Sequence, residues 1–295
     1  ILMRGQVIKS DEFTKKTLKM YRLNYPKSPI FLSTWNNCID SNFHTFAEKY
    51  NINLILTEFK SPKTGYRNDN LQIIGNVRGL EEINKRSITY TLTTRTDQRF
   101  YNNNILMYLK NIHTNYPYLN SQNPKDKQIE RLLAMSFDTF MFKLYGIGDM
   151  FLFGLSKDVF NYWNSQKDKR IFDREDNENK IYTLKSLAKA RLSEVYFMTE
   201  FLKRNGHELK WTLQDYFKVI KDRFIIIDSA SMDFFWPKYT FFEDRHKDFE
   251  DIKYKEISYA DWLQIKNNQL SPNEKILDLP LISKSFKSIK KFFKR

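Results

Sequence analysis

The chemistry of this chain is most visible at Arg95 and Asp97, which end a strand-like segment. Residues 88–101 read ITYTLTTRTDQRFY, and positions 90–95 alternate between two faces. Ligands of open α/β sheets bind at the carboxyl ends of strands, so these side chains could meet a nucleotide there. A carboxylate can bind a divalent ion that neutralises a diphosphate, and a guanidinium can fork onto phosphate oxygens. The alternative role for Asp97 is that of a turn or cap residue.

Any nucleotide would have to be held by side chains rather than by a glycine loop. The sequence contains no Walker loop and no G-x-G-x-x-G, G-x-S-x-G or H-E-x-x-H motif, and it has 8 glycines in all. Arginines placed in the strand-end half of the predicted sheet could supply the grip on an anionic ligand. These are Arg4, Arg67, Arg78, Arg95 and Arg99.

The elements that must position these groups follow a β-α rhythm through residues 1–100. Apolar runs and one alternating segment predict strands at Ile1–Ile8, Ile30–Thr34, Ile52–Phe59 and Tyr90–Thr94. Helical spacing between them predicts helices at Thr14–Tyr25, Phe43–Tyr50 and Asp69–Ile83. This rhythm implies an α/β fold with a doubly wound, mainly parallel sheet and right-handed crossovers.

Beyond Asp97 the rhythm changes. Strand-like segments are predicted at Leu132–Phe142, at the end of Gly146–Gly154 and at Phe224–Ile227. Helices are predicted at Asn102–Asn115, Val159–Trp163, Ser193–Leu202 and Trp211–Arg223, and a charged surface loop at Ser165–Lys180. We expect residues 101–230 to complete the domain begun by 1–100. An irregular or helical extension then covers 231–282, and a basic tail covers 283–295.

Composition narrows the class of protein. The chain has 295 residues, of which 41% are hydrophobic and 16% aromatic, which allows an ordinary buried core. One cysteine, Cys38, excludes an internal disulfide framework and fits a reducing compartment. The four histidines are scattered and lack zinc spacing. No signal peptide or bilayer-spanning apolar run is evident.

Six of the charges that make up the formal net charge of +14 lie in the last 13 residues of the given sequence. Ser283–Arg295 reads SKSFKSIKKFFKR, with six cations and no acid. On a helical wheel Ile282, Phe286, Ile289 and Phe293 share one face and lysines the other. This pattern predicts peripheral contact with an anionic membrane, and docking on the protein's own core is the alternative. We expect no nucleic-acid partner, because no binding motif for one is present.

At this point the chain resembles a known family. RGQVI, IFLSTW, YRNDNLQIIGNVRGL, TTRTDQ, GDMFLFG and SEVY occur here in the order seen in the WavE lipopolysaccharide-synthesis family. The resemblance covers roughly Ile1–Leu202. Its most specific parts are Ile30–Trp35 and Arg67–Asp97. It implies a nucleotide-sugar-dependent glycosyltransferase of GT-A type, with a nucleotide-binding half in 1–100 and an acceptor-binding half in 101–230.

The resemblance assigns roles to particular residues. The loop Arg4, Gly5, Gln6 would meet the nucleotide, as would Arg67 and Asn70 of the second motif. Asp97 would take the last position of the Asp-x-Asp motif, whose carboxylate holds Mg²⁺ or Mn²⁺ on the diphosphate. The first position of that motif is Arg95 here. A guanidinium cannot bind a cation, so it could replace part of the metal's charge neutralisation.

The resemblance also points to a base for the acceptor hydroxyl. A glycine before a strand, followed tens of residues later by an acid at a helix start, matches Gly148-Asp149 and Ser193-Glu194. Glu194 would be the base and Asp149 an acceptor-binding carboxylate, or the reverse. The alternatives are a helix-dipole acid for Glu194 and a turn residue for Asp149. Trp35 could stack on a sugar or base, or belong to the core.

The function implied is transfer of a sugar from a nucleotide-sugar donor to a glycan or glycolipid acceptor. The setting would be synthesis of bacterial surface polysaccharide: lipopolysaccharide, lipooligosaccharide or capsule. The protein would be cytoplasmic and peripheral on the inner face of the inner membrane. Two alternatives stay open. One is a nucleotidyl- or phosphate-transferring enzyme on a similar sheet, and the other is a non-catalytic protein that binds anionic lipid or polyanions.

Overall fold

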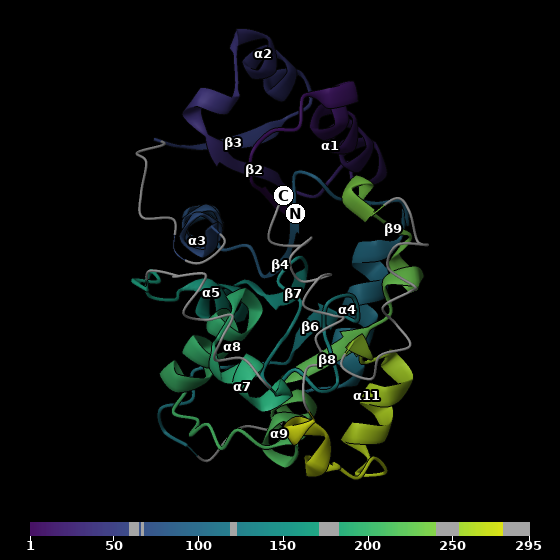
Figure 1. Ribbon diagram of the computed structural model, residues 1–295. Helices are drawn as coiled ribbons and strands as arrows, with labels where there is room; N and C mark the ends of the chain where they lie inside the picture. The colour runs from purple at the N-terminus through teal and green to yellow at the C-terminus, as the bar shows by residue number, and fades with distance from the viewer. Residues whose placement is uncertain (59–64, 66–67, 119–122, 171–182, 240–253, 280–295) are drawn as a thin grey trace.

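A seven-stranded mixed sheet forms the centre of the molecule (Figure 1). The computed structural model describes residues 1–58, 65, 68–118, 123–170, 183–239 and 254–279. The strands lie in the order β3-β2-β1-β4-β7-β6-β8. Their bounds are β1 Leu2–Arg4, β2 Ile30–Trp35, β3 Ile52–Thr57, β4 Tyr90–Arg95, β6 Leu132–Met135, β7 Leu152–Leu155 and β8 Phe224–Ile227.

Most neighbouring strands run parallel. β1 pairs in parallel with β2 and β4, β2 with β3, and β6 with β8. β7 is antiparallel to both of its neighbours, β4 and β6. The α/β class and the mainly parallel mixed sheet predicted from the sequence are therefore confirmed, and the arrangement is compatible with a doubly wound fold. Residues 1–100 and 101–230 both contribute strands to this one sheet.

Helices flank the sheet. In Figure 1, α3, α5 and α8 lie to one side of the central strands and α4 to the other. Capping side chains fix several helix starts: Asp40 accepts from the Phe43 N–H of α2 at 2.8 Å, and Thr212 accepts from the Asp215 N–H of α9 at 3.2 Å. The helices are α1 Phe13–Asn24, α2 Ser41–Lys49, α3 Asp69–Lys85, α4 Ile105–Asn115, α5 Ser156–Trp163, α7 Leu184–Lys189, α8 Ser193–Arg204, α9 Leu213–Arg223 and α11 Tyr259–Lys266.

Two glycines let α3 lie close over β1. A Cβ added at Gly79 would lie 2.4 Å from Leu2 Cδ1, and Leu2 is fully buried. One helical turn earlier, a Cβ at Gly75 would lie 3.8 Å from the Arg4 Cβ, which is an ordinary contact. The helix therefore touches the strand most tightly at Gly79, and its first turns lie beside the carboxyl end of β1.

Two predicted strands are shorter than expected. The strand predicted at Ile1–Ile8 ends at Arg4, because Gly5 takes a φ of +122° that turns the chain. The strand predicted at Leu132–Phe142 ends at Met135, and Asp138 has a φ of 62°. Residues 139–141 bond to a distant segment instead, since the Met141 N–H donates to the Lys255 carbonyl at 2.7 Å.

A small second sheet joins distant parts of the chain. β5, Arg99–Phe100, pairs antiparallel with β9, Phe234–Phe235, which the sequence did not predict. This pairing brings the segment after Asp97 next to Trp236. In the described residues no helix combines the length and apolarity needed to cross a bilayer. The predicted membrane-binding tail, Ser283–Arg295, lies outside the described residues.

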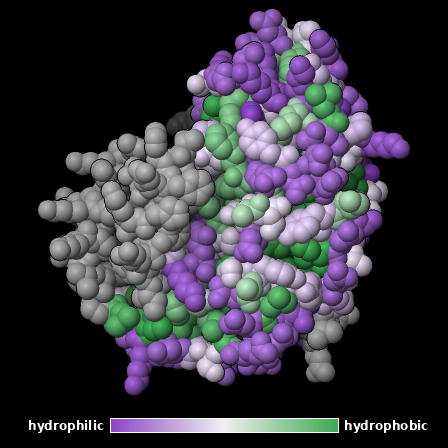
Figure 2. Space-filling model, turned by 90° about the vertical axis from the view of Figure 1, so that its right-hand side faces the viewer, coloured by the Kyte–Doolittle hydropathy of each residue, from purple (hydrophilic) through white to green (hydrophobic). Residues whose placement is uncertain are grey.

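Hydrophobic and hydrophilic areas alternate over the face seen in Figure 2. The large apolar side chains exposed among the described residues come from separate elements rather than from one patch. They are Leu23, Leu56, Tyr101, Met107, Ile129 and Leu279. The described surface therefore gives the membrane prediction neither support nor contradiction.

Candidate active site

Two adjacent strands deliver arginines to the same edge of the sheet. Arg4 ends β1 and Arg95 ends β4, and the two are register partners in the parallel pairing. The loops that follow are tied together, since the Thr96 N–H donates to the Arg4 carbonyl at 3.0 Å and the Thr96 hydroxyl donates to the Gln6 carbonyl at 2.6 Å. A Cβ at Gly5 would lie 2.8 Å from the Thr96 Oγ1, so a side chain there would force these loops apart.

The Arg4 side chain is buried at the carboxyl end of β1. Its Nη2 donates to the backbone carbonyl of Asp149 at 2.7 Å, and its guanidinium lies 4.8 Å from the ring centroid of Trp163. Burial first and the charge of Arg95 as well lower the pKa of Arg4 to about 10, although Asp149 and Asp97 act to raise it. Arg4 remains cationic at neutral pH. Its charge is held where little water can screen it.

Arg95 and Asp97 form a forked ion pair. The Arg95 Nε donates to Asp97 Oδ1 at 2.9 Å and its Nη2 donates to Oδ2 at 2.8 Å. The Trp236 Nε1–H donates to the same Oδ2 at 3.1 Å, and the Arg95 guanidinium lies 5.1 Å from the Trp236 ring. Burial acts to raise the pKa of Asp97, but the bonds from Arg95 and Trp236 outweigh it and hold the pKa below its usual value. Asp97 is therefore ionised.

The fit of a metal ion to Asp97 is poor. Both of its carboxylate oxygens accept hydrogen bonds from Arg95, and a guanidinium repels a cation. Within the described part of the chain, no group of three or more His, Cys, Asp or Glu side chains could hold a metal ion. The predicted Mg²⁺ or Mn²⁺ dependence stays a prediction, and no step below is routed through a metal.

Asp149 lies beside Arg4, and the charge of Glu194 acts on it although the two acids lie 45 positions apart in sequence. Asp149 is buried, and burial first and then the charge of Glu194 raise its pKa, against the lowering influence of Arg4, Arg95 and Gln72. Glu194 lies in the first turn of α8 and is partly exposed, with its Oε2 at 2.9 Å from the Lys143 Nζ. Asp149 thus lies within electrostatic range of Arg4 and Arg95, and Glu194 within range of Asp149.

The remaining predicted nucleotide contacts are placed differently. Asn70 is buried, and its amide bonds to the backbone of Asp168: its Nδ2 donates to the Asp168 carbonyl at 2.9 Å and its Oδ1 accepts from the N–H at 2.6 Å. Asn70 therefore fastens α3 to the segment at 165–170. Gln6 is exposed in the loop after β1. Arg67 lies outside the described residues.

Two of the other arginines that the sequence offered lie away from this edge in structural roles. Arg99 donates to the Thr17 hydroxyl at 2.9 Å and its guanidinium lies 4.4 Å from the Phe13 ring centroid, so it fastens α1. Arg78 faces Glu81 on the outside of α3 at 3.9 Å. Trp35 is the last residue of β2 and is half-buried.

The sequence analysis did not predict the contacts of Trp236, Lys143 and Asp69, because these contacts come from tertiary packing.

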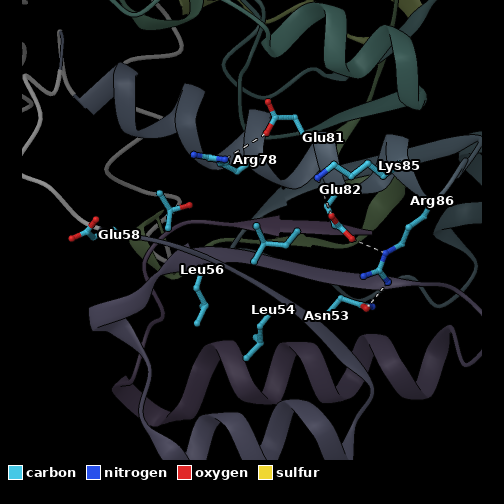
Figure 3. A pocket seen from close by; sticks show the side chains of 11 residues that line it. Asn53, Leu54, Leu56, Glu58, Arg78, Glu81, Glu82, Lys85 and Arg86 are labelled. Atoms are coloured by element: carbon cyan, nitrogen blue, oxygen red, sulfur yellow. Dashed lines mark hydrogen bonds and ion pairs between the residues drawn. The ribbon is translucent and has the colours of Figure 1, made fainter.

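A hollow in the described surface lies apart from Arg4 and Arg95. This groove lies between β3, at the free edge of the sheet, and the second half of α3 (Figure 3), and its volume is about 380 Å³. Arg86 bridges its two sides, donating to Glu82 on its own helix and to Asn53 on the strand. Leu54 and Leu56 point away from α3, toward the helices beneath the strand. Of the arginines that the sequence offered for an anionic ligand, Arg78 lines this groove.

The chain matches no protein-family model and is not significantly similar to any curated protein. The resemblance of its motifs to the WavE family therefore stays a prediction. The geometry by itself shows two arginines, Arg4 and Arg95, at the ends of adjacent parallel strands, with Asp149 beside Arg4.

Proposed function

We propose that this chain is a glycosyltransferase that moves a sugar from a nucleotide-sugar donor to a glycan or glycolipid acceptor. The observation that carries the proposal is that Arg4 and Arg95, at the ends of adjacent parallel strands, lie near Asp149, on which the charge of Glu194 also acts. Such strand ends are where open α/β sheets receive nucleotides. Guanidinium groups donate paired hydrogen bonds to phosphate oxygens, and a carboxylate can accept the proton of an acceptor hydroxyl.

Glu194 suits the role of base better than Asp149. Glu194 is partly exposed, and Lys143 orients its carboxylate, whereas Asp149 is buried and its pKa is raised. The acceptor oxygen would attack the anomeric carbon as its proton passes to Glu194. The bond from that carbon to the diphosphate would break, and its electron pair would leave with the diphosphate. Arg4 and Arg95 would stabilise the charge that develops on this leaving group.

The cellular setting is part of the same proposal. Assembly of bacterial lipopolysaccharide, lipooligosaccharide or capsule uses glycolipid and glycan acceptors at the inner membrane. The basic sequence Ser283–Arg295 supports a peripheral location on its cytoplasmic face, because such segments bind anionic lipid. The GT-A type of fold belongs to this proposal as well. The parallel pairing of the first four strands, β3-β2-β1-β4, supports this part of the proposal.

A panel of ligands tests the proposal. Nucleoside diphosphates and nucleotide sugars are added with and without Mn²⁺, and the unfolding midpoint of the full chain is measured. Binding to the folded state raises the midpoint. We expect a shift with one nucleotide, a smaller shift in Asp97→Ala and Arg95→Gln, and the wild-type shift in the matched control Arg78→Gln.

Turnover then separates the alternatives. Sugar transfer from the stabilising donor supports the proposal, whereas nucleotide consumption without sugar transfer favours nucleotidyl or phosphate transfer. If no nucleotide shifts the midpoint, and salt-sensitive binding to polyanions persists in Asp97→Ala and Glu194→Gln, the chain is a polyanion-binding protein and the proposal fails.

A further inference from the structure

Asp69, the first residue of α3, is a buried acid outside the set that the sequence singled out. It is fully buried, and neither carboxylate oxygen has a hydrogen bond among the described residues. The Ser193 hydroxyl faces it without reaching hydrogen-bond geometry. A carboxylate in this position would lose its hydration and gain no partner among the described residues, which is far more costly than taking up a proton.

The charges around Asp69 favour the same outcome. Burial first, and then the charges of Asp149, Glu194 and Asp168, raise the pKa of Asp69 to about 8, against a lowering influence from Ser193. The Arg170 guanidinium also faces Asp69, but it is forked onto the Asp168 carboxylate, with its Nη2 at 2.8 Å from Oδ2. At neutral pH, Asp69 is therefore mainly an uncharged carboxylic acid.

Other buried polar atoms lie between α3, α5 and the end of β1. Gln72 and Asn76, on the same helix as Asp69, have buried side-chain oxygens without a hydrogen bond among the described residues. The Arg4 Nε, the Tyr162 hydroxyl and the Trp163 Nε1 are likewise buried without a hydrogen bond among the described residues. The charges of Asp149 and Glu194 act on Tyr162, and Gln72 interacts with Asp149. Asp69 thus belongs to one polar interior that reaches the site.

We propose that Asp69 is a positioning residue of this site, which as a neutral acid allows Asp149 and Glu194 to lie close together while Glu194 still accepts a proton. A third negative charge beside these two would favour protonated Glu194 and would repel a diphosphate. The positioning role rests on the proposed function. The bound proton on Asp69 does not, and it can be measured without any substrate.

The first experiment measures the free energy of unfolding against pH in wild type and in Asp69→Asn. The asparagine side chain has nearly the same shape as aspartate but cannot bind or release a proton in this pH range. The folded-state pKa lies above the unfolded value near 4, so between about pH 4 and 8 the native protein binds one more proton. Its stability therefore falls as pH rises through that window, and the unfolding equilibrium constant increases up to about tenfold per pH unit from this group. We expect Asp69→Asn to lose this component and the exposed control Asp233→Asn to keep it. Identical profiles for wild type and Asp69→Asn would overturn the bound proton.

The second experiment is the pH profile of turnover with the donor found above. We expect the wild-type rate to fall on an alkaline limb near pH 8, and this limb to be missing in Asp69→Asn but present in Asp233→Asn. A limb that persists unchanged in Asp69→Asn overturns the positioning role. If no donor supports turnover, the proposed function fails, and the unfolding experiment still decides whether Asp69 holds a proton.

Discussion

The Arg4 Nη2 donates a hydrogen bond to the Asp149 backbone carbonyl at 2.7 Å, across 145 residues of sequence. This bond joins the end of β1, in the half predicted to hold the nucleotide, to the segment just before β7. The guanidinium also stacks on Trp163 of α5. One buried side chain therefore fixes the distance between the predicted donor-binding and acceptor-binding parts of the site.

Replacing Arg4 by lysine should destabilise the protein. A lysine has no planar fork, so it cannot both stack on Trp163 and reach the Asp149 carbonyl. Leaving a buried carbonyl without its donor costs about 1–3 kcal/mol in free energy of unfolding, measured by urea denaturation. The control Arg78→Lys changes a side chain that is 62% exposed, and its effect should stay within about 0.5 kcal/mol. Equal effects at the two positions would contradict the role assigned to Arg4.

The two glycines of α3 should respond in opposite directions to alanine. At Gly75 the new Cβ meets only an ordinary contact with Arg4, and alanine suits a helix better than glycine. We expect Gly75→Ala to raise the free energy of unfolding by about 0.5–1 kcal/mol. At Gly79 the Cβ would collide with Leu2 inside the core, so Gly79→Ala should lower it by about 1–3 kcal/mol. Urea denaturation of both variants checks this. A stabilising Gly79→Ala would show that α3 does not press on β1 there.

Glu194→Gln should remove general-base catalysis while keeping an acceptor for Lys143. We expect turnover to fall by about 10²–10⁴-fold, with little change in nucleotide affinity, because the base acts on the acceptor hydroxyl. The matched control is Glu200→Gln on the same helix, which loses part of its pairing with Arg191 but lies outside the proposed site. Steady-state kinetics with saturating donor distinguishes the two variants. Wild-type turnover in Glu194→Gln would transfer the base role to Asp149.

Deletion of Ser283–Arg295 should abolish binding to anionic membranes. The segment carries six of the cations and no acid, and its attraction to anionic lipid is screened by salt. We expect the shortened chain to stay in solution when anionic vesicles are sedimented, while turnover on a water-soluble acceptor is retained. Vesicle co-sedimentation that persists after the deletion would place the membrane contact elsewhere or exclude it.

The sequence predicted the first half of the fold well because each element there carries its own local signal. Apolar runs mark β2 and β3, and Pro26 follows the end of α1. The segment after β6 was assigned to a strand because it is apolar, but Phe137 packs against Trp236 and the backbone of Met141 bonds to Lys255. These partners are about 100 residues away, so no local pattern could indicate them.

The same distinction applies to the site. Arg95 and Asp97 follow a recognisable strand, so their place at the sheet edge could be predicted. Asp69 looks like an ordinary acid at a helix start, where the helix dipole favours a negative charge. Its burial depends on how α3 packs in the folded molecule. Its pKa is raised further by the charges of acids that other segments bring near it, such as Glu194 of α8. Its proton is therefore a property of the assembled molecule.

The reversed direction of β7 has a consequence for how this site can diversify. Because β7 runs against β4, its beginning lies at the edge where β1 and β4 end, and Asp149 comes just before that beginning. Arg4 and Arg95 are the last residues of their strands, whereas Asp149 precedes the first residue of β7. We call residues 136–148, which lead into β7, the arriving segment, and β1 and β4 the departing strands. Most of the arriving segment is buried, so substitutions at its partly exposed positions can change one side of the site while the departing strands keep their register. We expect substrate preference to vary between related chains chiefly in this arriving segment.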